Sequence, residues 1–113
     1  DWVSTPMIAE AAKLLQLNEL QEYEAPIRVS AISFGGLAFA GIAGEPFCEL
    51  GKHIREQSPF PVTLFCCLTN GGGDYFPTAE AFDQDGYEPR NCRFAKGVGE
   101  HLSNAVCELL HSL

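Results

Sequence analysis

Three polar side chains follow two apolar stretches of the sequence, at the points where buried strands are expected to end. Glu45 comes after the apolar run 37–42, and Asn70 and Tyr75 come after the run 62–68. If these runs form neighbouring parallel strands, their carboxyl ends share one edge of the sheet, which is where open α/β sheets bind ligands. A carboxylate and a phenol that meet there could ligate a metal, or could act as a general base and an oxyanion donor.

The stretch from Asn70 to Glu88 carries most of these candidate residues. It opens with three consecutive glycines and contains two tyrosines, Tyr75 and Tyr87, each beside acidic residues and turn formers. Glycines at the end of a strand let the backbone turn tightly and approach other groups closely. Because such loops carry binding and catalytic residues disproportionately, we interpret this stretch as the functional edge of the domain.

Each candidate also has an ordinary structural explanation. Pro46 is typical of a first helical position, so Glu45 could be only a carboxylate that the helix dipole favours. Tyr75 could be a loop aromatic that packs on the core. These explanations predict a non-catalytic binding or structural module, and they stay open beside the catalytic interpretation.

The elements that would position these residues form an α/β domain with a mixed sheet of three or four strands. Two strand-like runs, 27–34 and 37–42, are joined by Gly35-Gly36, which predicts a hairpin. The second run is almost entirely apolar, which predicts a central strand with both faces covered. A helix between it and the run 62–68 would make these two strands parallel.

About three amphipathic helices are expected to flank this sheet. The first covers Pro6 to about Leu17, and the second runs from Glu45-Pro46 to about Gln57, where Ser58-Pro59 ends it. The clearest pattern is the last, in which apolar residues recur at helical spacing to the end of the chain. The apolar residues of these three patterns are Ile8, Ala11, Ala12 and Leu15; Phe47, Leu50 and Ile54; and Val98, Leu102, Val106, Leu109, Leu110 and Leu113.

Composition and charge narrow the possible partners and compartments. The 113 residues correspond to one domain or a fragment of one, and the net charge of −8 makes nucleic acid an unfavourable partner. No apolar run is long enough to span a bilayer. Five scattered cysteines favour a reducing compartment, although a signal upstream of Asp1 would allow secretion. Cys66 and Cys67 are expected to be buried and inert, but a thiol-dependent hydrolase that uses either of them, or Cys92, stays open.

One combination of motifs resembles a known family. The order Gly-Glu-Pro-Phe after an apolar strand, then Asn-Gly-x-x-x-Tyr-x-Pro-Thr, an acidic helical stub, Gly-Tyr-Glu and a terminal amphipathic helix is similar to the C-terminal part of the catalytic domain of neutral/alkaline non-lysosomal ceramidases and their bacterial relatives. The resemblance covers residues 34–113 and is most specific over 70–88. It implies that this chain is the C-terminal portion of a larger catalytic domain.

The resemblance also implies a reaction and a set of residues for it. The family hydrolyses the amide of ceramide with a zinc ion held by two histidines, a glutamate and a tyrosine. By motif, Glu45 and Tyr75 look like the glutamate and tyrosine ligands, and Tyr87 looks like the tyrosine that hydrogen-bonds the scissile carbonyl. We expect Asn70 to contact the substrate as well. The two histidines would come from the N-terminal remainder of the protein, and the isolated chain would be inactive on ceramide or a related N-acyl lipid.

Overall fold

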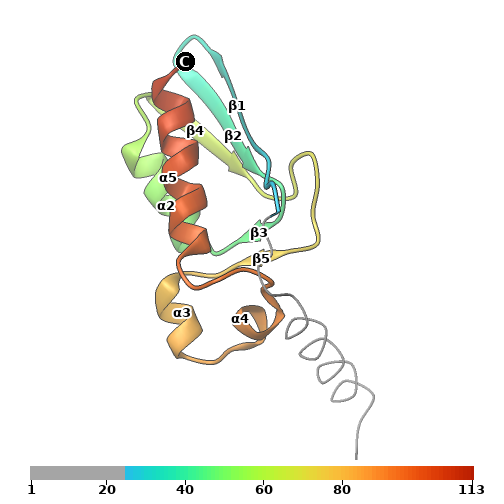
Figure 1. Cartoon of the computed structure of the whole chain (residues 1–113). Coiled ribbons are helices and arrows are strands. Elements are labelled where there is room, and N and C mark those ends of the chain that lie inside the picture. The colour runs from blue at the N-terminus through green and yellow to red at the C-terminus, as the bar shows by residue number, and fades with distance from the viewer. Residues whose placement is uncertain (1–24) are drawn as a thin grey trace, which may run out of the picture.

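The computed structural model describes residues 25–113, and its centre is a three-stranded mixed sheet (Figure 1). Strand β1 (Val29–Phe34) turns at Gly35 and pairs antiparallel with β2 (Leu37–Ile42). Strand β4 (Val62–Cys66) pairs with the other side of β2 in parallel orientation. The predicted hairpin, the central position of the second strand and the α/β class are therefore confirmed. The predicted helix over residues 6–17 lies outside the described residues.

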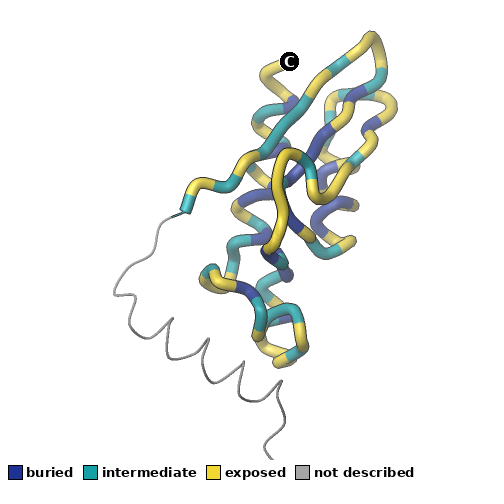
Figure 2. Tube along the Cα trace, turned by 90° about the vertical axis from the view of Figure 1, so that its right-hand side faces the viewer, coloured by how far each residue is buried: buried dark blue, intermediate teal, exposed yellow. Residues whose placement is uncertain are grey.

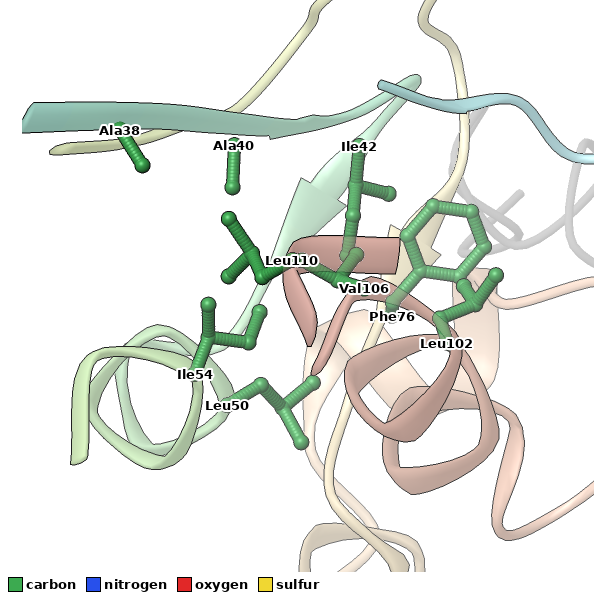
Figure 3. Packing of buried hydrophobic residues seen from close by; sticks show 9 residues of the cluster. All are labelled: Ala38, Ala40, Ile42, Leu50, Ile54, Phe76, Leu102, Val106 and Leu110. Carbon is green, nitrogen blue, oxygen red and sulfur yellow. The ribbon is translucent and has the colours of Figure 1, made fainter. Parts of the chain in front are cut away.

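Two helices cover one face of this sheet and build the core (Figure 1). Helix α2 (Cys48–Gln57) makes the crossover from β2 to β4, and helix α5 (Val98–His111) ends close to the end of the chain, as its apolar spacing predicts. Figure 3 shows the buried side chains that meet between the sheet and these two helices. These are Ala38, Ala40 and Ile42 from β2, Leu50 and Ile54 from α2, Leu102, Val106 and Leu110 from α5, and Phe76.

The start predicted for helix α2 is wrong. Glu45 and Pro46 form a short strand, β3 (Glu45–Pro46), which pairs in parallel with β5 (Tyr75–Phe76). The Glu45 N–H donates to the Asp74 carbonyl over 2.9 Å, and the Phe47 N–H donates to the Phe76 carbonyl over 3.1 Å. Because these bonds hold the backbone extended, the helix cannot begin before Cys48.

The stretch after β5 contains two short helices. Helix α3 (Ala79–Asp83) is capped by Thr78, whose hydroxyl accepts a hydrogen bond from the Ala81 N–H, and helix α4 (Tyr87–Asn91) follows. The Glu100 carboxylate of α5 accepts a second bond from the Ala79 N–H over 2.8 Å. These caps satisfy backbone donors that a helix start leaves unpaired, and the Glu100 bond attaches α3 to the start of α5.

The opposite face of the sheet is open in the described part of the chain. Figure 2 shows exposed positions along the strands as well as in the loops. Phe39 in the central strand is 41% exposed, whereas its neighbours Ala38 and Ala40 are buried under the helices. We predicted that both faces of β2 are covered. Within residues 25–113, one face is covered and the other is open. Within the same residues, no helix is long and apolar enough to cross a membrane.

Candidate functional site

The short β3–β5 ladder brings two of the predicted site residues together. Glu45 and Tyr75 are in-register partners of this parallel pair. Side chains that occupy matching positions on neighbouring parallel strands project to the same side of the sheet. The carboxylate and the phenol, thirty positions apart in the sequence (45 to 75), therefore lie side by side, as their positions after two strand ends predict.

Tyr87 joins this pair through a ring contact. It is the first residue of α4, and its ring meets that of Tyr75 edge to face, with centroids 5.9 Å apart and planes at 74°. Edge-to-face contact is a favoured arrangement for aromatic pairs. Tyr87 is 66% exposed, so its phenol is accessible from solvent. The structure thus places Glu45, Tyr75 and Tyr87 in one cluster, which we call the tyrosine site.

The tyrosine site carries a concentration of negative charge. The Glu45 carboxylate is the main cause that raises the pKa of the Tyr75 phenol above its ordinary value; desolvation, Tyr87 and Glu88 raise it further. A carboxylate disfavours a second anion close to it, so the Tyr75 phenol loses its proton less readily than an ordinary tyrosine. A bound cation would reverse this effect, because it would stabilise both the carboxylate and a phenolate.

The backbone around the tyrosine site is anchored by close packing. Phe76, next to Tyr75, is completely buried in the core, and Pro77 after it is buried as well. Gly44 lies directly against the Phe76 ring, and a Cβ at this position would collide with that ring and with the Asp74 carbonyl. A glycine at position 44 is therefore required for β3 to lie against β5.

A partly buried ion pair supports the same strand. Asp74 is 8% exposed, and its two carboxylate oxygens accept hydrogen bonds from Nε and a terminal nitrogen of Arg93, each over 2.7 Å. Such two-point pairing fixes the orientation of both groups. It ties the residue before Tyr75 to the segment after α4. The sequence contains no signal for this pair, because its members are separated by two helices and have no regular spacing.

Asn70 lies at the same edge of the sheet but makes its hydrogen bond elsewhere. Its side-chain amide donates to the Ser30 hydroxyl at the start of β1 over 3.2 Å. It adopts a positive φ of 59°, a conformation that asparagine tolerates better than most residues. It also lines two hollows, of about 250 and 370 Å³. No contact described for residues 25–113 joins it to the tyrosine site.

The donor set of the tyrosine site fits one half of a zinc site. Zinc in proteins takes nitrogen, sulfur or oxygen donors in sets of four, or of three with an open position. Glu45 and Tyr75 supply two oxygens on one side of the β3–β5 ladder. In the described part of the chain, no group of three or more His, Cys, Asp or Glu residues could hold a metal ion. A complete site therefore requires further donors.

Glu45 does not stand at the entry of helix α2, where its structural explanation put it. Helix α2 is preceded by Phe47 as its N-cap residue, and the acidic residue of its first turn is Glu49. Glu45 is exposed and belongs to a strand. Tyr75 is half-buried and packs against Tyr87.

The prediction that Cys66 and Cys67 are buried is wrong. Cys66 and Cys67 are both exposed, because β4 ends at Cys66 and one of its faces is open. Cys92 is buried, and its thiol donates to the Phe94 carbonyl over 3.7 Å. Exposure by itself does not activate a thiol, since the nucleophile is the thiolate.

Comparisons with protein-family models, with curated proteins and with solved structures found no match to this chain.

Proposed function

We propose that this chain is the C-terminal portion of a ceramidase-like zinc amidohydrolase, which cleaves the amide bond of ceramide or of a related N-acyl lipid. Glu45 and Tyr75 would be zinc ligands, and Tyr87 would contact the substrate. The observation that supports this most is the cluster itself: three residues selected by motif, from two strands and a helix, lie together at one edge of the fold.

The chain's own residues would hold and orient the reacting groups. The β3–β5 ladder sets the spacing between the Glu45 carboxylate and the Tyr75 phenol. The Tyr87 hydroxyl is exposed beside them and can donate a hydrogen bond to a carbonyl oxygen. A donor that is fixed before the reaction stabilises the negative charge that develops on such an oxygen during amide hydrolysis.

Zinc would supply what these residues lack. When bound, it would acidify a water molecule and polarise the amide carbonyl. Glu45 and Tyr75 would hold it with two histidines from the N-terminal remainder of the protein. His53 lies on α2 and is exposed, while His101 and His111 lie on α5. None of them belongs to the tyrosine site, so the isolated chain should be inactive.

The first test is the size of the native protein. An immunoblot of source cells with an antibody against this chain should show a band well above 12.3 kDa. Zinc content and amide hydrolysis would then be measured on that protein and on Tyr75→Phe and Glu45→Gln variants, with Glu108→Gln on the exposed side of α5 as the control. Both site variants should lose zinc and activity. Unchanged zinc content and hydrolysis in Tyr75→Phe would refute the ligand assignment.

A non-catalytic binding or structural module is the second candidate. One observation favours it: residues 25–113 contain no group that could hold a metal by itself. A native band at 12.3 kDa, together with the absence of zinc from the purified protein, would support this function over the enzyme.

A further inference from the structure

The open face of the sheet changes from apolar to polar along the strands. Strand pairing arranges its side chains in three rows: Phe34, Leu37 and Val62; Ile32, Phe39 and Leu64; and Ser30, Gly41 and Cys66. All members of the first two rows except Leu37 are exposed, from 41% at Phe39 to 84% at Phe34. We call these six residues the apolar face. A contiguous exposed apolar patch of this kind marks a site of contact with another molecule.

An arginine stands at the polar end of this face. Beyond the Val29–Ile42 pair, the Ala43 N–H donates to the Arg28 carbonyl over 3.0 Å, so the pairing of the two strands extends to Arg28. Alternate residues of a strand project to the same face, so Arg28 follows Ser30 on the open side. Arg28 is exposed, and none of the ion pairs described for residues 25–113 involves it. Over roughly 20 Å, the length of six residues, the face thus passes from this cation to the apolar rows.

Two hollows follow the same gradient. The first, of about 250 Å³, is lined by Ile32 and Phe39, and the second, of about 370 Å³, is lined by Arg28 and Gly71. Asn70 lines both hollows, so they adjoin. Together they reach the range of about 300–1,000 Å³ that small-molecule sites occupy, and such sites combine apolar walls with a few polar groups. The two hollows therefore form one elongated site, apolar at one end and polar at the other.

The polar end of this site offers hydrogen-bond donors to an anion. Gly71 and Gly72 line the second hollow with Arg28, and none of the hydrogen bonds described for residues 25–113 uses their N–H groups. A guanidinium and exposed backbone N–H groups are the donors that bind carboxylates in proteins. Asp74 lines the hollow as well, but both of its oxygens accept hydrogen bonds from Arg93, which balances its charge. The second hollow is therefore suited to a negatively charged group.

We propose that the two hollows bind a long-chain carboxylate, with its charged group at Arg28 and its alkyl chain along the apolar face. The chain would lie over Ile32 and Phe39, and contact between them would remove apolar surface of both partners from water. The net charge of −8 acts weakly here, because physiological salt screens exposed charges beyond about 8 Å. The site uses no residue of the tyrosine site, so it holds or fails independently of the proposed function.

A second copy of the chain is the competing occupant, and charge favours the carboxylate. The three rows of the open face contain no acidic residue, so a second copy packed on them face to face would offer no anion to Arg28. Two chains that each carry a net charge of −8 also repel each other. A carboxylate with an alkyl chain matches both ends of the site.

The first test measures affinity against chain length. Octanoate and dodecanoate would be titrated into the 113-residue chain by isothermal calorimetry, below the concentrations at which they form micelles. Dodecanoate should bind at least tenfold more tightly, because it has four more methylenes to place on the apolar face. Equal affinities, or no binding of either compound, would overturn the proposal.

Matched variants locate the two ends of the ligand. Arg28→Gln should weaken dodecanoate binding at least about fivefold, whereas Arg55→Gln removes an exposed arginine from α2, on the other side of the sheet (Figure 1), and should leave it unchanged. Ile32→Gln should weaken binding about tenfold, and Leu113→Gln at the end of the chain should not. Ile32 and Leu113 are 66% and 54% exposed, so both variants should fold. Equal losses within either pair would show that the effect is not local and would contradict the site.

Spin-labelled stearate tests the orientation without any substitution in the protein. A nitroxide next to the carboxylate should broaden the backbone amide signals of Arg28 and Ala43 most strongly, and a nitroxide near the methyl end should broaden those of Phe34 and Leu37. The reverse order, or strongest broadening on α2 or α5, would contradict the proposal. Light scattering of the ligand-free chain provides the last check, because a dimer that dodecanoate does not dissociate would assign the face to a second copy instead.

Discussion

The helical core and the tyrosine site are held together by different forces. The core consists of apolar side chains from β2, α2 and α5, several of them completely buried, and its stability comes from removing that surface from water. The region around the tyrosine site has one deeply buried aromatic anchor, Phe76, the partly buried Asp74–Arg93 pair, and two ion pairs at its surface. Surface ion pairs contribute little to stability. The comparison teaches that the core supports the fold while the site region can vary in charge without unfolding it.

The largest expected effect is therefore in the core. Leu110→Ala should lower the free energy of unfolding by about 2–5 kcal/mol, because Leu110 is completely buried and its truncation leaves a cavity. Urea unfolding followed by circular dichroism measures this loss. Leu113→Ala removes the same atoms from a side chain that is 54% exposed and should change stability by less than about 0.5 kcal/mol. Similar losses in both variants would contradict the helix packing.

The second effect tests the anchor between core and site. Gly44→Ala should cost about 1–3 kcal/mol, because the added methyl group meets the Phe76 ring and the Asp74 carbonyl. Gly36→Ala is the control, since a Cβ there has only ordinary contacts, the nearest at 3.6 Å. Hydrogen exchange at the backbone N–H of Glu45, which donates to the Asp74 carbonyl, should also become faster in Gly44→Ala. Unchanged exchange would show that β3 and β5 do not depend on this close approach.

The third effect concerns the ion pair of the site region. Asp74→Asn should lower the free energy of unfolding by about 1–2 kcal/mol, because it weakens two charge-assisted hydrogen bonds to Arg93 at a position that is mostly buried. Asp85→Asn weakens a similar pair with Arg90 at an exposed position, and its effect should be too small to resolve in the same urea titration. Equal losses of unfolding free energy in Asp74→Asn and Asp85→Asn would show that burial does not make the Asp74–Arg93 pair the stronger of the two.

The smallest effect is electrostatic and appears only at high pH. Since the pKa of Tyr75 is raised in the folded chain, chiefly by Glu45, the unfolded chain loses this proton first as the pH rises. The associated stability is complete below the unfolded pKa of about 10 and is lost as the pH rises through the higher folded value. Glu45→Gln should lower the Tyr75 pKa, measured by ring-carbon NMR, and should lessen the alkaline loss of stability. Glu108→Gln should change neither.

The sequence by itself determined the elements with strong local patterns. The apolar spacing from Val98 onward predicted α5, and Gly35-Gly36 between two strand-like runs predicted the hairpin. The parallel pairing of β2 and β4 followed from the helix between them. These features depend on neighbours along the chain, so local propensity and connection rules were sufficient to predict them.

Tertiary structure decided the features that depend on distant residues. Pro46 has the local character of a helix start, yet pairing with β5 made it a strand residue, because backbone bonds to Asp74 and Phe76 replaced those of a first helical turn. The motif selected Glu45, Tyr75 and Tyr87, but the register of β3 and β5 and the position of α4 place them side by side. The Asp74–Arg93 pair had no sequence signal at all. Contacts between segments far apart in the chain are set by packing, which single residues do not encode.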